Sequence, residues 1–110
     1  MDLTGKREDY VRLLNASLEA AIDKLSRLDN VKRISIFGSY AAGKANLFSD
    51  LDILVIMETD KSFLERMREL YSLLALPVDV DILCYTPEEF DGLKKTPFMW
   101  RILSEEVVLL

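Results

Sequence analysis

The chain has 110 residues, of which 50% are hydrophobic and 30% are charged, and its formal net charge is -5. This composition predicts one globular domain over residues 1–110 and excludes a disordered or fibrous protein, or a catalytic domain with a separate substrate domain. The acidic balance argues against strong nucleic-acid binding, which depends on Lys and Arg side chains that neutralise phosphates.

The first half of the chain predicts one helix followed by two strands. Apolar residues recur at spacings of three and four over residues 10–28, which is typical of an amphipathic helix. Such a helix more often covers one face of a sheet than binds a partner. Apolar, β-branched runs at 34–37 and 51–57 then predict two strands joined by a polar loop.

A second helix and a third strand follow residue 57. The helical pattern covers residues 63–74, and Asp60 is its expected N-cap. Residues 78–85 are rich in β-branched side chains and predict the third strand. Cys84 is the one cysteine of the chain, so we expect a buried, unreactive thiol in this strand.

The C-terminal part predicts two short helices and an edge strand. Thr86, Pro87 and a glutamate at the third position form a capping box, which explains the acidic pair at 88–89 better than a catalytic role. Another helix begins at Thr96, and Trp100 within it is expected in the core or an interface. Residues 107–110 predict the last strand.

The order of these elements predicts an α/β (α+β) fold with a mixed sheet of about four strands and helices packed on it. No apolar run is long enough to span a bilayer, and the first ten residues lack the apolar stretch of a signal peptide. We therefore expect a cytoplasmic protein without membrane contact.

Two acids at the start of the second strand are the strongest chemical signal. Asp50 and Asp52 are two residues apart, so their side chains project from the same face of a strand, whereas Leu51 and Ile53 point to the other. Like charges at one site require a cation or a proton. The chain has no histidine, so carboxylate chemistry with magnesium is favoured over transition-metal chemistry.

The third strand repeats this pattern with Asp79 and Asp81, which share a face. Composition alone treats these two acids as equals. Asp81 lies between Val80 and Ile82, so we expect it deeper in the strand, where an ionised carboxylate is costly unless a metal or a donor meets it.

The loop between the first two strands contains G-S-Y-A-A-G-K at residues 38–44, which matches a phosphate-binding P-loop at both glycines and at Lys44. The next position should be a Ser or Thr that binds magnesium, but it is Ala45. The loop also leads into a strand, whereas a P-loop opens a helix. We therefore reject the P-loop interpretation.

A Gly38-Ser39 pair, ten intervening residues, Asp50-Leu51-Asp52 and a later strand that carries an acid resemble the DNA polymerase β-type nucleotidyltransferase superfamily. Within it, the chain is similar to the small stand-alone or minimal nucleotidyltransferases, many of which act as antitoxins beside HEPN-domain partners. The resemblance extends from the first helix to about residue 90. It implies the polymerase β-like fold, in which the first two strands are antiparallel neighbours.

The resemblance also implies roles for the loop. Gly38 lets the backbone approach a nucleoside triphosphate, and Ser39 offers its hydroxyl and N–H to phosphate oxygens. Lys44 and Ser49 complete the expected nucleotide-binding residues. Related proteins often carry a basic residue where this chain has Ala42, and Lys44 is the expected substitute.

The resemblance also implies a catalytic role for the aspartates. By resemblance, Asp50, Asp52 and Asp81 bind one or two Mg²⁺ ions and ATP is the substrate. We expect their carboxylates to converge within a few ångströms of a common point. Asp81 is preferred to Asp79 as the third carboxylate because it fits better the family's spacing before a Tyr-Thr-Pro turn.

The implied function is magnesium-dependent transfer of a nucleoside monophosphate, AMP from ATP, to a hydroxyl of an acceptor that a partner supplies. Two alternatives stay open: an antitoxin that binds and neutralises a HEPN-type toxin, and a nucleotide-binding module without turnover. The sequence identifies neither the acceptor nor the oligomeric state, a homo-oligomer included.

Overall fold

A computed structural model describes residues 3–110 of the chain. Its four-stranded sheet has the order β3-β2-β1-β4, built from β1 (Val31–Phe37), β2 (Leu51–Met57), β3 (Val80–Tyr85) and β4 (Val107–Val108). β1 is antiparallel to both β2 and β4, whereas β2 and β3 are parallel. The predicted mixed sheet and the antiparallel pairing of the first two strands are therefore confirmed.

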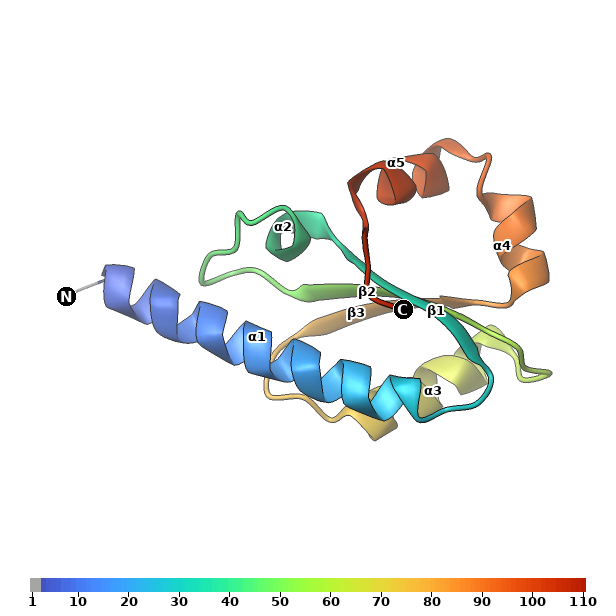
Figure 1. Ribbon diagram of the computed structural model, residues 1–110, viewed down its shortest axis with the longest axis horizontal. Coiled ribbons are helices and arrows are strands. Elements are labelled where there is room, and N and C mark those ends of the chain that lie inside the picture. The colour runs from blue at the N-terminus through green and yellow to red at the C-terminus, as the bar shows by residue number, and fades with distance from the viewer. Residues whose placement is uncertain (1–2) are drawn as a thin grey trace.

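Helices cover both faces of this sheet (Figure 1). The long helix α1 (Leu3–Ser26) and α3 (Phe63–Leu74) lie on one face. α4 (Pro87–Leu93) and α5 (Pro97–Glu105) lie on the other. A single turn, α2 (Gly38–Ala41), follows β1 directly.

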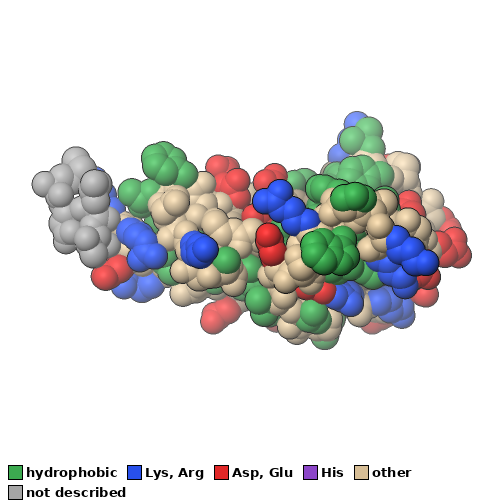
Figure 2. Space-filling model, turned by 90° about the horizontal axis from the view of Figure 1, so that it is seen from above, with side chains coloured by type: hydrophobic (Ala, Val, Ile, Leu, Met, Phe, Trp, Pro, Cys, Tyr) green, Lys and Arg blue, Asp and Glu red, His purple; other side chains and the backbone are tan. Residues whose placement is uncertain are grey.

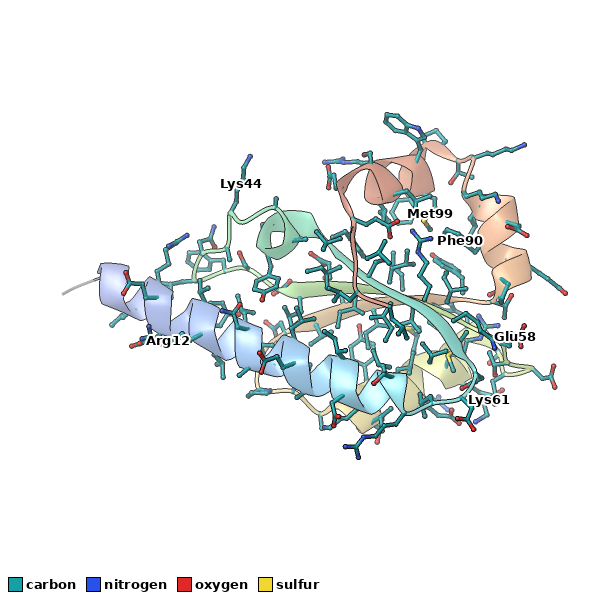
Figure 3. The ribbon with its side chains drawn as sticks, viewed as in Figure 1. Arg12, Lys44, Glu58, Lys61, Phe90 and Met99 are labelled. Atoms are coloured by element: carbon teal, nitrogen blue, oxygen red, sulfur yellow. The ribbon has the colours of Figure 1, made fainter. Side chains whose placement is uncertain are left out.

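The alternation of side chains along β2 divides the interior into two clusters. One face of β2 packs in the larger cluster with α1 and α3, through Leu51, Ile53, Val55 and Met57. The other face presents Leu54 and Ile56, which pack with Met99 and Ile102 of α5. In Figure 3, Met99 of α5 and Phe90 of α4 extend into the space between these helices and the sheet.

Several predicted boundaries differ from the structure. α1 begins at residue 3 rather than 10, because its first turns are polar and carry no apolar period. β1 begins at Val31 rather than 34, because Lys32 and Arg33 interrupt the apolar run without breaking the extended backbone. The last strand covers only Val107–Val108.

The helix caps give one correction and one confirmation. Ser62, not Asp60, is the N-cap of α3, and its hydroxyl accepts from the N–H of Glu65. The capping box at Thr86 is confirmed, since Glu89 bonds back to the Thr86 N–H at 2.9 Å. Glu89 also accepts from the buried Arg66 of α3 at 2.7 Å, which lowers the pKa of this carboxyl. The glutamate therefore has a structural role.

Two single residues were also predicted. Trp100 is 68% exposed, so it is not in the core, and its alternative place in an interface stays a prediction. Cys84 is fully buried, and burial raises the pKa of its thiol to about 11, which confirms an unreactive cysteine. Within residues 3–110, no helix has both the length and the apolar character that crossing a bilayer requires.

Candidate active site

The central strand β2 brings acids from two strands together. Asp52 pairs in register with Phe37 of β1 on one side and with Asp81 of parallel β3 on the other. Residues in register on neighbouring strands share a face, so the side chains of Asp52 and Asp81 lie next to each other. Asp50 and Asp79 immediately precede their strands, and the N–H of Leu51 donates to the Asp79 carbonyl at 3.0 Å. The four aspartates thus occupy one end of two adjacent strands.

The neighbouring acids affect the pKa values of Asp50 and Asp52. Desolvation first, then the charges of Asp81 and Asp50, raise the pKa of Asp52 to about 6. The pKa of Asp50 is also raised, by desolvation and then by Asp81 and Asp79. Asp81 is the largest charge acting on both carboxyls, whereas Asp79 acts on Asp50 alone of the two. This pattern favours Asp81 over Asp79 as the third member of the group.

The carboxylates of the candidate site lie farther apart than the sequence predicted. Within the described residues, no three acidic or other ligand side chains are close enough to form a complete metal-binding cluster, so the expected convergence on one point is absent. Asp81 is also exposed: it is the second residue of β3, and of its two neighbours only Ile82, which faces the other side of the sheet, is buried. The expectation of a deeply placed Asp81 is wrong. Carboxylates that repel each other and are open to water lie apart.

The donor set nevertheless fits a hard divalent cation. Carboxylate oxygens are the ligands that Mg²⁺ prefers. Burial first, and then the charges of Asp81 and Asp50, disfavour the ionised form of Asp52 in this arrangement. A divalent ion would supply a positive charge and favour the ionised carboxylate.

Gly38 lies directly against the acid pair. Its φ of +81° is in the left-handed region that favours glycine, and a Cβ built there would be 2.1 Å from Oδ2 of Asp52. Any side chain at this position would therefore displace the carboxylate. The structure places Gly38 and Asp52 together, and Ser39 follows on the exposed turn α2.

The second serine of the loop has its hydrogen bonds within the protein. Ser49 is buried, and its Oγ is 3.0 Å from Oγ of Ser39 and accepts from the N–H of Asn46 at 2.9 Å. The hydroxyl of Tyr10 donates to the Ser49 carbonyl at 2.7 Å. These contacts orient the Ser39 hydroxyl and tie the loop to α1. Ser49 is thus a positioning residue, and Tyr10 is a contributor that sequence reasoning missed.

Lys44 is not brought to the acids. It is exposed on the loop after α2 and points away from the sheet in Figure 3. A cavity of about 530 Å³ lies between α1, α2 and β4 and is lined by none of the four aspartates. A smaller cavity lies between the candidate site and α5, and Gly38, Asp52 and Arg101 are among the residues that line it. Sequence reasoning missed this contribution of α5.

The free energy of unfolding should depend on pH through the Asp52 carboxyl. In the metal-free protein, the free energy of unfolding should fall as pH rises from about 4 to about 6, because folded Asp52 holds a proton that the unfolded chain releases near its ordinary pKa of about 3.9. The Asp52→Asn variant should lack this component and be more stable than the wild type at pH 7. Urea unfolding in the presence of a chelator, at several pH values, measures it. If the free energies of unfolding of the two proteins depend on pH in the same way, this result would contradict the raised pKa of Asp52.

A family model described as a nucleotidyltransferase domain matches residues 18–104. The chain belongs to this nucleotidyltransferase family. A relative from Methanocaldococcus jannaschii that is named as a protein adenylyltransferase is 48% identical over 81 residues, which are 73% of this chain and 81% of the relative. The matched range of the family model contains Gly38, Asp52 and Asp81.

Solved structures agree with the family. A minimal nucleotidyltransferase aligns with a TM-score of 0.60 and 32% identity, covering 90% of this nucleotidyltransferase and 95% of the other chain. A chain of the MntA–HpeT toxin–antitoxin complex aligns with a TM-score of 0.56, covering 87% of this chain and 71% of its own, and at 21% identity it shows a shared fold. The resemblance to small polymerase β-type nucleotidyltransferases is therefore confirmed.

Proposed function

We propose that this nucleotidyltransferase transfers AMP from ATP to a hydroxyl group of a partner protein. The observation that carries the proposal is the pairing of Asp52 with Asp81 across β2 and β3, directly against Gly38. This arrangement puts carboxylates beside a stretch of backbone that a phosphate group can approach closely because Gly38 has no side chain. The name of the relative from Methanocaldococcus jannaschii, a protein adenylyltransferase, supports AMP as the transferred group.

The acids and the loop have separate roles in this proposal. Asp50, Asp52 and Asp81 would hold one or two Mg²⁺ ions, which neutralise the charge of the triphosphate when bound. Ser39 donates its hydroxyl to a phosphate oxygen, and Ser49 keeps that hydroxyl in place. The backbone at Gly38 admits the phosphates next to Asp52.

The reaction is an in-line displacement at the α-phosphorus of ATP. The acceptor oxygen forms a bond to this phosphorus while the bond to the bridging oxygen breaks and pyrophosphate leaves. The proton of the acceptor hydroxyl passes to a carboxylate oxygen of Asp81. Because Asp81 is exposed, an acceptor on another protein can reach it from solution. This exposure supports an acceptor that a partner supplies.

Intact-mass measurement tests the proposal. The protein is incubated with ATP, magnesium and the product of the neighbouring gene, and both proteins are weighed before and after. We expect the partner to gain one or more AMP units with the wild type and none with Asp52→Asn. GTP, CTP and UTP in parallel reactions establish the nucleotide preference. An unchanged mass of both proteins under all conditions would contradict nucleotidyl transfer.

The antitoxin function is the second candidate, and it is favoured by the shared fold with a chain of the MntA–HpeT toxin–antitoxin complex. It requires that this chain bind a toxic partner, of the HEPN type by the resemblance, and abolish its activity. Co-expression distinguishes the two functions. Neutralisation by the wild type and equally by Asp52→Asn supports binding alone, whereas neutralisation by the wild type only supports transfer as its mechanism.

A further inference from the structure

Helix α5 forms one wall of the candidate site. A cavity of about 250 Å³ lies between this helix and the adjoining ends of β1 and β2, and it is lined by Phe37, Gly38, Asp52, Phe98, Arg101, Ile102 and Glu105. Two residues of the proposed nucleotide site therefore share one cavity with four residues of α5. In Figure 2, which looks down on this side of the molecule, acidic and basic side chains lie next to one another near the middle.

The site needs a cation that the loop does not supply. The triphosphate of a nucleotide is strongly anionic, and three proposed site residues are acids. Ala42 has no charge, and Lys44 points away from the sheet. Arg101 is the only basic residue among the lining residues of this cavity within the described part of the chain.

The guanidinium of Arg101 is available for a ligand. Its side chain is 81% exposed, and its ion pair joins Nε to Oε1 of Glu105 at 3.8 Å, beyond hydrogen-bond distance. Among residues 3–110, no hydrogen bond occupies the two terminal nitrogens of Arg101. An exposed pair of this kind contributes little to stability, about 0–1 kcal/mol. Loss of the side chain should therefore leave the fold intact.

The size and the walls of the cavity indicate which part of a ligand enters it. Pockets for whole organic ligands usually measure about 300–1,000 Å³, so a cavity of about 250 Å³ fits phosphate groups better than a complete nucleotide. Phe98 and Ile102 give it apolar sides, and the exposed guanidinium of Arg101 lies at its edge. A planar guanidinium binds two phosphate oxygens at once.

We propose that Arg101 binds the phosphate groups of the nucleotide from the α5 side of the cavity, opposite the backbone at Gly38. The inference rests on the proposed nucleotidyl transfer and adds a binding residue to it. In the free protein, Glu105 keeps the guanidinium near the cavity. Phosphate oxygens replace that weak contact when the nucleotide binds.

Equilibrium binding in the presence of Mg²⁺ tests the proposal with three probes: ATP, pyrophosphate and adenosine. Arg101→Ala should weaken binding of ATP and pyrophosphate by about 10- to 100-fold and leave adenosine binding unchanged, because the side chain contacts phosphate only. Arg101→Lys keeps the charge but not the planar guanidinium, so its affinity for ATP and pyrophosphate should lie between those of the wild type and Arg101→Ala. Arg68→Ala, an exposed arginine of α3 outside the cavity, is the matched control and should bind as the wild type does.

Each outcome has one meaning. If Arg101→Ala binds ATP as tightly as the wild type, Arg101 does not bind phosphate, although the proposed transfer stands. If the variant loses ATP and adenosine affinity equally, the phosphate assignment is wrong. If the wild type itself binds none of the three probes, the proposed function fails. Circular dichroism verifies that all three variants are folded.

Discussion

Replacing Asp81 with Asn is expected to reduce transfer of AMP by about 1,000-fold or more, whereas Asp79→Asn should lose far less. Asp81 is in register with Asp52 and is the largest charge acting on both Asp50 and Asp52. Asp79 precedes the strand, and of the two carboxyls it acts on Asp50 alone. Removal of the Asp81 charge therefore affects the whole acid group and removes the proposed proton acceptor.

Single-turnover transfer from ATP at saturating magnesium measures this difference, with the acceptor identified by mass. The two variants are matched, since each exchanges one exposed carboxylate for an amide at the same end of the sheet. Equal folding of both variants is verified by circular dichroism. If Asp79→Asn is the inactive variant and Asp81→Asn retains most activity, the third carboxylate is Asp79.

Gly38→Ala should reduce transfer by about 100-fold or more, because displacement of a reacting group by about 1 Å has an effect of this size. The new Cβ would lie 2.1 Å from Oδ2 of Asp52 and 3.1 Å from its Cγ, so the whole carboxyl group must move. The left-handed backbone adds strain to this collision.

The Gly43→Ala variant distinguishes the effect of contact with Asp52 from the effect of strain in a left-handed backbone. Gly43 has a similar φ of +73°, but a Cβ there would meet no atom within 4 Å. This variant should lose about 1–2 kcal/mol of stability through backbone strain and keep its transfer activity. Urea unfolding and single-turnover transfer, measured on both variants, provide the comparison. Equal inactivation of the two variants would show that backbone strain, not contact with Asp52, explains the loss.

The parts of the site that were predictable from the sequence depend on short-range geometry. Residues two apart in an extended chain share a face, which predicts that Asp50 and Asp52 lie together; Asp50 immediately precedes β2, and its charge acts on Asp52. The glycine at position 38 is singled out through the resemblance, because the Gly38-Ser39 pair precedes Asp50-Leu51-Asp52 by ten residues. The four-strand sheet followed from the alternation of apolar runs with helical patterns.

Register and burial across strands were not predictable in this way. The pairing of Asp52 with Asp81 depends on how β3 returns beside β2 after α3, which no local pattern specifies. The apolar neighbours of Asp81 suggested a deep position, but neighbours in a strand face the opposite side and do not determine its exposure.

The role of α5 was missed although its sequence holds a signal. The cavity-lining residues of this helix are spaced at i, i+3, i+4 and i+7, which places them on one helical face: Phe98, Arg101, Ile102 and Glu105. The spacing defines the face but not what it packs against. That depends on tertiary packing between α5 and the ends of β1 and β2.

The division of the interior has a consequence for motion. Among the described residues, the layer of α4 and α5 packs on the sheet through a small cluster in which partly buried side chains such as Phe90 and Leu103 surround four buried ones: Leu54, Ile56, Met99 and Ile102. The cluster on the other face is much larger and fixes the strands that carry the acids. Because regions with few buried contacts open first, α5 can separate from the sheet while β1, β2 and β3 keep their register. In the proposed transfer, nucleotide entry and pyrophosphate release would then require only local opening of one layer, and the carboxylate frame would stay assembled between turnovers.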